Sequence, residues 1–164
     1  MIRVLLADAH IVIREGIKWI LSDVDNLVVS GEASNSAEVL ALVANQVADL
    51  LVLDPLMPGD RGLELIELVK QKKPTLPILI FSTHLEECYV LHTQLAGASG
   101  YLAKDSDCEV LISVIRKVAA GGVHVNDRVA ELLARERMTN TGELPQVTRL
   151  DREFQTLKTS LQMA

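Results

Sequence analysis

The sequence is poor in aromatic residues and in basic charge, and each shortage excludes a class of protein. Only 3% of its 164 residues are aromatic, so the core must be aliphatic, and surfaces that stack nucleic-acid bases are not expected. The net charge of −6 argues against non-specific nucleic-acid binding, because phosphate contacts need a basic surface. The apolar fraction of 49% still allows one domain of common size with a real core.

Cysteine and long apolar runs are also scarce. Cys88 and Cys108 form no CxxC motif and no Cys/His cluster, so a structural zinc site is excluded and reduced, buried or half-buried thiols are predicted. No basic-then-apolar leader is present, and no apolar run approaches the roughly 20 residues of a membrane span. We therefore expect a soluble cytoplasmic protein with no membrane partner.

What the chain does have is a regular alternation of two apolar patterns. Continuous aliphatic runs, typical of strands buried on both faces, cover residues 2–7, 27–30, 50–53, 78–81 and 100–103. Segments with helical spacing of apolar residues cover 12–21, 36–46, 63–69, 85–96 and 110–118, and Asn35 or Ser36 can cap the second of them. This alternation predicts an α/β fold, with right-handed crossovers, a parallel sheet and helices on both faces.

The C-terminal part departs from this alternation and predicts a helical tail. A turn and a short helix are expected over 123–138, with Asn126 as the cap. Residues 139–148 are rich in turn formers and predict a linker. A last short helix is expected over 151–161.

Polar side chains follow four of the predicted strands. Asp8 follows the first strand, Asp54 the third, Ser82 and Thr83 end the fourth, and Lys104 follows the fifth. Function gathers at the carboxyl ends of the strands in such sheets, so we expect these side chains to share one shallow pocket.

This set of residues suits phosphoryl transfer to a carboxylate. Asp54 would act as the nucleophile, Lys104 would pair with a phosphoryl oxygen, and Ser82 would donate a hydrogen bond to another. Mg²⁺ prefers oxygen ligands and keeps several waters. Asp8, Asp54 and the Leu56 carbonyl would therefore be its ligands.

Four motifs occur in the order and spacing of one family, over about residues 1–122. They are LLADAHIVIREG, LDPLMPGDRG, FST and GASGYLAKD. The set resembles the receiver domain of bacterial two-component response regulators, of the subfamily with a C-terminal LuxR-type helix-turn-helix. The resemblance implies a flavodoxin-like, doubly wound sheet of five strands in the order 2-1-3-4-5. It also implies that Asp54 is the phosphoacceptor, Ser82 the switch hydroxyl, Tyr101 the switch aromatic and Lys104 the phosphoryl-binding lysine.

The resemblance also implies partners and an output. A sensor histidine kinase would supply the phosphoryl group, and transcription would be regulated through a switched partner or homodimer surface. That surface would be the face of the fourth helix, fifth strand and fifth helix, around Tyr89, Leu95, Tyr101 and Leu111, or else the first and fifth helices. Residues 149–164 resemble the start of the output domain, through Arg152 and Glu153. Without a recognition helix, this chain is not expected to bind DNA specifically.

Ala9 departs from the family pattern, in which two adjacent acids follow the first strand. The missing carboxylate is expected to weaken Mg²⁺ binding, since a methyl group supplies neither charge nor a ligand. Two hypotheses follow: a phosphorylation-controlled receiver, or a pseudo-receiver that keeps the fold and acts as an interaction module. A flavin- or dinucleotide-binding enzyme is disfavoured, because no GxGxxG motif follows the first strand.

Simpler roles remain open for individual residues. Asp8 has an alternative role as a helix cap, and Tyr101 fits a half-buried packing role as well as a switch. Trp19 is predicted to be a packing residue of the first helix. The histidines are predicted to be surface or satisfied residues, with His10 or His84 as alternatives for the rim of the pocket.

Overall fold

The computed structural model describes residues 1–59, 62–83 and 86–139. The strands are β1 (Ile2–Ala7), β2 (Leu27–Ala33), β3 (Leu50–Leu53), β4 (Ile78–Ser82) and β5 (Gly100–Ala103). The helices are α1 (Ile11–Ser22), α2 (Ser36–Asn45), α3 (Gly62–Lys72), α4 (Glu87–Leu95), α5 (Cys108–Ala119) and α6 (Asp127–Thr139). No helix within those ranges has the length and apolar character needed to cross a membrane.

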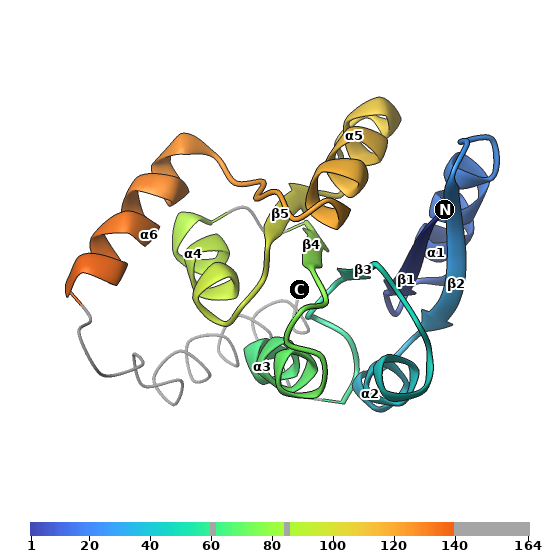
Figure 1. Ribbon diagram of the computed structural model, residues 1–164, viewed down its shortest axis with the longest axis horizontal. Helices are drawn as coiled ribbons and strands as arrows, with labels where there is room; N and C mark the ends of the chain where they lie inside the picture. The colour runs from blue at the N-terminus through green and yellow to red at the C-terminus, as the bar shows by residue number, and fades with distance from the viewer. Residues whose placement is uncertain (60–61, 84–85, 140–164) are drawn as a thin grey trace, which may run out of the picture.

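All five strands form one parallel sheet in the order β2-β1-β3-β4-β5, as predicted (Figure 1). The order reverses at β1, whose two neighbours are the strands that follow it in the sequence. β2 is longer than the predicted 27–30, because a register shift opposite Val4 and Leu5 places Ser30 in a bulge beyond which pairing resumes.

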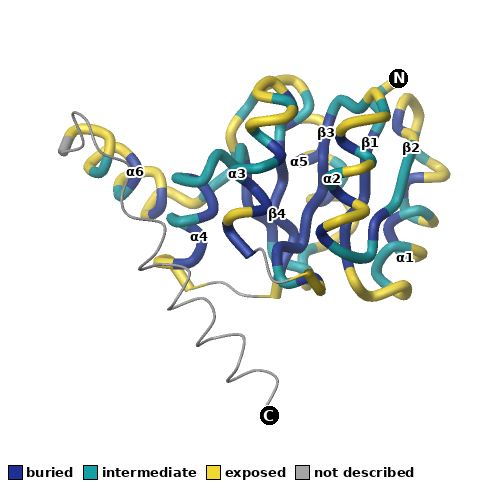
Figure 2. Tube along the Cα trace, turned by 90° about the horizontal axis from the view of Figure 1, so that it is seen from below, coloured by how far each residue is buried: buried dark blue, intermediate teal, exposed yellow. Residues whose placement is uncertain are grey.

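Alternate side chains of the strands point to opposite faces of the sheet and contribute to two separate apolar layers. On β1, Leu5 and Ala7 face the layer covered by α2, α3, α4 and α6. Val4 and Leu6 face the layer covered by α1 and α5. Figure 2 shows the resulting pattern, with buried strands between helices whose outer sides are exposed. Because both faces are covered, the strands read as continuous aliphatic runs in the sequence.

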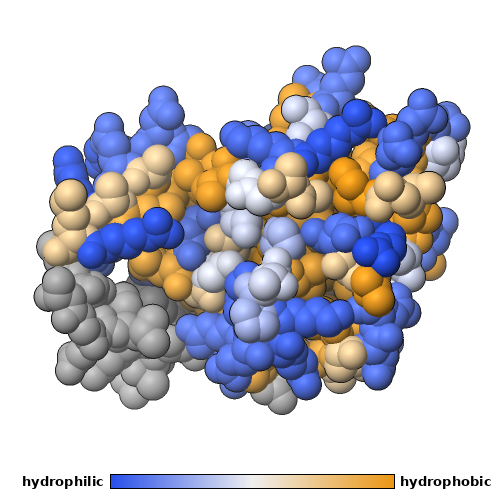
Figure 3. All heavy atoms as spheres, viewed as in Figure 1, coloured by the Kyte–Doolittle hydropathy of each residue, from blue (hydrophilic) through white to orange (hydrophobic). Residues whose placement is uncertain are grey.

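α6 is an addition to this frame and lies against α4 (Figure 1). Val129 is fully buried and Leu133 is 8% exposed, and both belong to the apolar layer that contains Tyr89 and Tyr101. The segment before α6 runs along the edge of the sheet, where the Tyr101 N–H donates to the His124 carbonyl at 2.8 Å. Figure 3 shows hydrophobic residues where α4 and α6 meet, with hydrophilic residues over much of the rest of this face.

Helix caps follow the sequence closely. The Asn35 side chain accepts a hydrogen bond from the Glu38 N–H at 3.0 Å, and the Asn126 side chain accepts one from the Val129 N–H at 2.8 Å. These are the N-cap contacts expected of asparagine. The predicted linker over 139–148 and the last helix over 151–161 lie, from residue 140 onward, outside the described residues.

Two predictions about packing are wrong. Trp19 is 75% exposed. Ile17 and Leu21 form the buried face of α1, and Trp19, two positions from each of them, therefore points away from that face. Cys88 and Cys108 are free, as predicted, but both are exposed rather than buried. They lie in the first turns of α4 and α5, on the solvent side.

Candidate functional site

The site lies at the carboxyl edge of the sheet, where backbone hydrogen bonds between strands align the predicted residues. The Asp54 N–H donates to the Ala7 carbonyl at 2.8 Å, and the Lys104 N–H donates to the Ser82 carbonyl at 3.0 Å. Each site residue thus extends the pairing of its own strand by one position. Asp8, Asp54 and Lys104 meet because of strand order, although they are far apart in the sequence.

The Lys104 ammonium lies between the two carboxylates. Its Nζ is 2.6 Å from Asp8 Oδ2 and 2.6 Å from Asp54 Oδ2. Burial lowers the pKa of Lys104, but the hydrogen bond and charge of Asp54, followed by those of Asp8, outweigh it and raise the pKa above its ordinary value. One cation therefore serves two acids that are 4% and 7% exposed.

The remaining carboxylate oxygens also have protein donors. Asp54 Oδ1 accepts a hydrogen bond from the Leu56 N–H at 3.0 Å. Asp8 Oδ1 accepts one from the His10 N–H at 2.8 Å, and the His10 ring Nδ1 lies 3.0 Å from the same oxygen. Asp8 Oδ2 is buried, and its contact in the described structure is the ion pair with the Lys104 ammonium at 2.6 Å.

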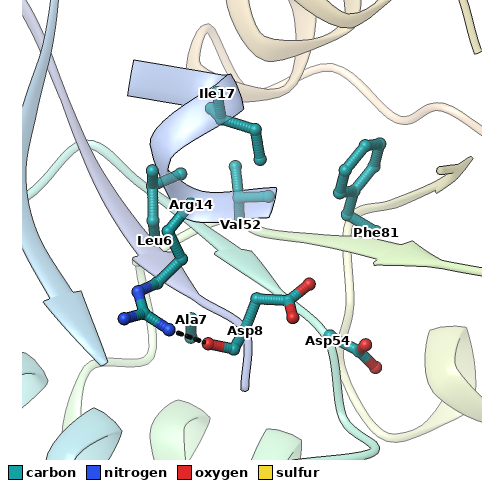
Figure 4. Close-up of a pocket in the computed structure, with 8 residues that line it drawn as sticks. All are labelled: Leu6, Ala7, Asp8, Arg14, Ile17, Val52, Asp54 and Phe81. Carbon is teal, nitrogen blue, oxygen red and sulfur yellow. Dashed lines mark hydrogen bonds between the residues drawn. The ribbon is translucent and has the colours of Figure 1, made fainter. Parts of the chain in front are cut away.

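Arg14 supports the loop that carries Asp8. Its guanidinium donates to the Asp8 carbonyl at 2.7 Å (Figure 4). It also forms an ion pair with Glu32 of β2 at 3.2 Å. Above Asp8 and Asp54, apolar side chains of the strands and α1 close the pocket, namely Leu6, Ala7, Ile17, Val52 and Phe81. The carboxylates therefore lie against apolar side chains, whose low local dielectric strengthens the charge interactions of the carboxylates.

Arg14 and His10 were not predicted as contacts of Asp8, although His10 was an alternative for the rim. Both belong to the ADAHIVIREG stretch, so their nearness in sequence was visible. The sequence did not reveal that the ring and the guanidinium turn back toward the strand end. The other rim alternative, His84, lies outside the described residues.

The predicted switch residues end β4, follow it directly, or lie on β5. Ser82 is fully buried, whereas Thr83 is exposed. Tyr101 is 7% exposed, and its ring meets that of Tyr89 edge to face, with 6.2 Å between centroids. Burial raises the pKa of Tyr101 to about 12, against an opposing effect of Ser82. Both predicted roles of Tyr101, packing and switching, are compatible with this position.

Most of the residues named for the predicted partner surface are buried, whereas the surface itself stays a prediction. Tyr89, Tyr101 and Leu111 are all less than 9% exposed. Tyr89 and Tyr101 belong to the apolar layer that includes residues of α6, and Leu111 belongs to the layer covered by α1 and α5. Leu95 alone of the four is half-buried. α6 packs against α4, and the segment before α6 pairs with β5 at His124, neither of which was indicated by the sequence of the helical tail.

The donor set does not fit a resident Mg²⁺. Among the described residues, no three His, Cys, Asp or Glu side chains are grouped so as to hold a metal ion. Ala9 is exposed and offers a methyl group, and Asp8 and Asp54 already share the Lys104 ammonium. Mg²⁺ is usually held by one or two carboxylates and several waters, and here both carboxylates already pair with an ammonium. The backbone carbonyl of Leu56 is the one further candidate ligand proposed from the sequence.

Comparison with known proteins gives a consistent picture. The family model of the response regulator receiver domain matches residues 4–116. Transcriptional regulatory protein DegU of Brevibacillus brevis is 33% identical over 144 residues, which make up 87% of this chain and 61% of that protein. Nitrate/nitrite response regulator protein NarL of Escherichia coli K12 is 32% identical over 155 residues, or 92% of this chain and 72% of that protein.

A solved structure agrees with these relatives. The crystal structure of a LuxR-family two-component response regulator from Aurantimonas sp. SI85-9A1 matches with a TM-score of 0.73 and 32% identity, over 83% of this chain and 97% of that one. The chain spans less than two thirds of the length of DegU.

Proposed function

Because the chain belongs to the response regulator receiver family, of the LuxR/NarL type, we propose that it accepts a phosphoryl group on Asp54 and passes the signal on through its α4 and β5 face. A receiver domain is a signalling module and not an enzyme in the usual sense. The proposal gives a role to this pocket, in which the burial of two carboxylates costs free energy of folding.

The contact that carries the proposal is that of Lys104 with Asp8 and Asp54, at 2.6 Å from each. Buried charges are retained only when they are paired. Here the pairing is incomplete, since two carboxylates share one ammonium. A buried cluster of ionisable groups with this imbalance at a strand edge is a candidate functional site.

The residues supply distinct parts of the transfer. Asp54 offers one oxygen as the nucleophile, while the Leu56 N–H orients the carboxylate through the other. Lys104 moves its ammonium from the carboxylate to a phosphoryl oxygen, as a point charge suited to that task. Ser82, fully buried at the adjacent strand end, donates its hydroxyl to a second phosphoryl oxygen, with Thr83 at the mouth of the pocket.

The signal would travel through contacts already present. Tyr101 lies on β5, three residues before Lys104 and opposite Ile80 of β4, and its ring packs with that of Tyr89 of α4. Its backbone is bonded to the segment that leads into α6. If Ser82 moved toward a phosphoryl group, the space beside Tyr101 would change. This change would shift the equilibrium between different packing arrangements of α4 and α6.

A sensor histidine kinase is the proposed donor, and the cytoplasm the proposed location. Regulation of transcription is the proposed outcome. A homodimer is proposed as well, with the α1 and α5 surfaces preferred over the α4 and β5 face that α6 covers.

A pseudo-receiver is the alternative, and Ala9 favours it. In that case the chain would act as a phosphorylation-independent interaction module whose pocket stays as it is. The two functions differ in whether a phosphodonor changes the protein covalently.

Incubation with acetyl phosphate, followed by intact-mass measurement, separates them. The proposal predicts one added phosphoryl group on the unaltered chain and none on Asp54→Asn. Asp105→Asn is the matched control, because it removes an exposed acid beside Lys104 and is expected to keep the adduct. The absence of an adduct on any chain favours the pseudo-receiver, and an adduct that survives Asp54→Asn excludes Asp54 as the acceptor.

A further inference from the structure

The pocket already contains a cation, the Lys104 ammonium, which balances one of its two carboxylate charges. Receiver domains typically bind Mg²⁺, yet the Lys104 ammonium is in ion-pair contact with both acids of this pocket. We propose that Lys104 is the resident cation of this site, that the site does not bind Mg²⁺, and that phosphoryl transfer to Asp54 does not require it. The last part rests on the proposed function, and the first two do not.

Each carboxylate oxygen is engaged, which is the first reason. Lys104 contacts one oxygen of each acid, the Leu56 N–H binds the second oxygen of Asp54, and His10 binds the second oxygen of Asp8. The oxygens keep further lone pairs, but a metal ion that used them would lie beside the buried Lys104 ammonium and be repelled by it. This repulsion is not offset, because an exposed methyl group stands where a third acid would add negative charge.

The charge balance is the second reason. Asp8, Asp54 and Lys104 sum to one negative charge, whereas an acid at position 9 would make the sum two. Arg14 adds no free charge, since it is paired with Glu32. A pocket with fewer acids repels an incoming phosphoryl group less, so less added positive charge is needed for transfer.

The transfer step balances without a metal or a proton donor. With acetyl phosphate, the bond from an Asp54 oxygen to phosphorus forms as the bond from phosphorus to the acetyl oxygen breaks. Acetate leaves with the electron pair and needs no proton. Lys104 then faces the phosphoryl oxygens and Asp8.

Metal binding tests the proposal without reference to activity. Mn²⁺ serves as the probe, because it accepts the same oxygen ligands as Mg²⁺ and its free form is counted by electron paramagnetic resonance. The unaltered chain is expected to leave Mn²⁺ free at millimolar concentration. Ala9→Asp is expected to bind it at least about tenfold more tightly, the effect of one charge-assisted ligand.

Two variants sharpen this measurement. Lys104→Gln removes the resident cation and should also gain Mn²⁺ binding, with Asp8 and Asp54 left to share the metal. Ala120→Asp adds the same charge as Ala9→Asp at the exposed end of α5 and should gain none. Mn²⁺ binding by the unaltered chain, or equal gains from Ala9→Asp and Ala120→Asp, overturns the proposal.

Phosphorylation with and without EDTA tests the part that rests on the proposed function. An adduct on Asp54 of equal extent in both conditions supports it. An adduct that appears only with Mg²⁺ overturns the inference and leaves the proposed function standing. An absent adduct in all conditions, with Mn²⁺ unbound, overturns the proposed function and leaves Lys104 as the resident cation.

Discussion

Replacing Lys104 by methionine isolates the charge pairing that defines the site. The lysine side chain is 8% exposed, and the two acid side chains it contacts are 5% and 9% exposed. Methionine fills the space of the aliphatic stem but leaves Asp8 and Asp54 buried together without a cation. The variant therefore tests electrostatics with little change in packing volume.

The expected loss follows from the geometry. Breaking a buried ion pair by removing one partner costs about 3–5 kcal/mol. His10 and the Leu56 N–H remain bonded to the acids, which places the expected loss near the lower end, at about 3 kcal/mol. Because the folded-state pKa of Lys104 is raised, its contribution is fully present below the ordinary value of 10.5 and is lost as the pH rises through the folded-state value.

Urea unfolding at pH 7 measures this loss, and a double-mutant cycle assigns it. Lys104→Met should cost clearly less in the Asp8→Asn background, where one buried carboxylate remains instead of two. Lys70→Met is the matched control, because its ammonium donates to the Leu76 carbonyl at 3.0 Å, and it should cost about 1 kcal/mol. A loss at Lys104 no larger than at Lys70, or unchanged by Asp8→Asn, would refute the reasoning.

Further predictions concern the tyrosines, α6 and two glycines. Burial raises the pKa of both tyrosines, to about 12 for Tyr101. An alkaline absorbance titration should therefore show no tyrosinate near pH 10 as long as circular dichroism reports a native fold. A titration midpoint near pH 10 would contradict this. Leu133→Ala should cost about 2–4 kcal/mol by urea unfolding, against less than about 0.5 kcal/mol for the exposed Met138→Ala. Gly59→Ala should destabilise by about 1–3 kcal/mol in the same assay, since Gly59 has a φ of 114° and a Cβ would meet an α2 side chain at 2.9 Å. Gly16→Ala, with open space around it, should stabilise by about 0.5–1 kcal/mol.

The sheet and most of the site could be predicted because both depend on short-range patterns. Strands buried on both faces appear as aliphatic runs, and parallel order places their carboxyl ends together. Asp8, Asp54, Ser82 and Lys104 were identified on this basis. Their closeness needs only strand order, which the alternation of strands and helices restricts strongly.

The contacts that were missed depend on side-chain direction and on packing between distant segments. A tryptophan is predicted to lie in the core because it is large and apolar, but the angular position of Trp19 on α1 places it in solvent. The burial of Tyr89 under α6 could not be read from either helix alone, because nothing local indicates which face the tail covers. Likewise, Lys104 was expected to meet a phosphoryl group, and its simultaneous contact with both acids emerged only from the structure.

Mapping the phosphoryl group to one residue tests the central claim most directly. After incubation with acetyl phosphate, borohydride reduction and peptide mass spectrometry report which carboxyl group was modified. We predict that Asp54, and not Asp8, carries the modification. Modification of Asp8, or of neither acid while the chain remains folded, would contradict the account.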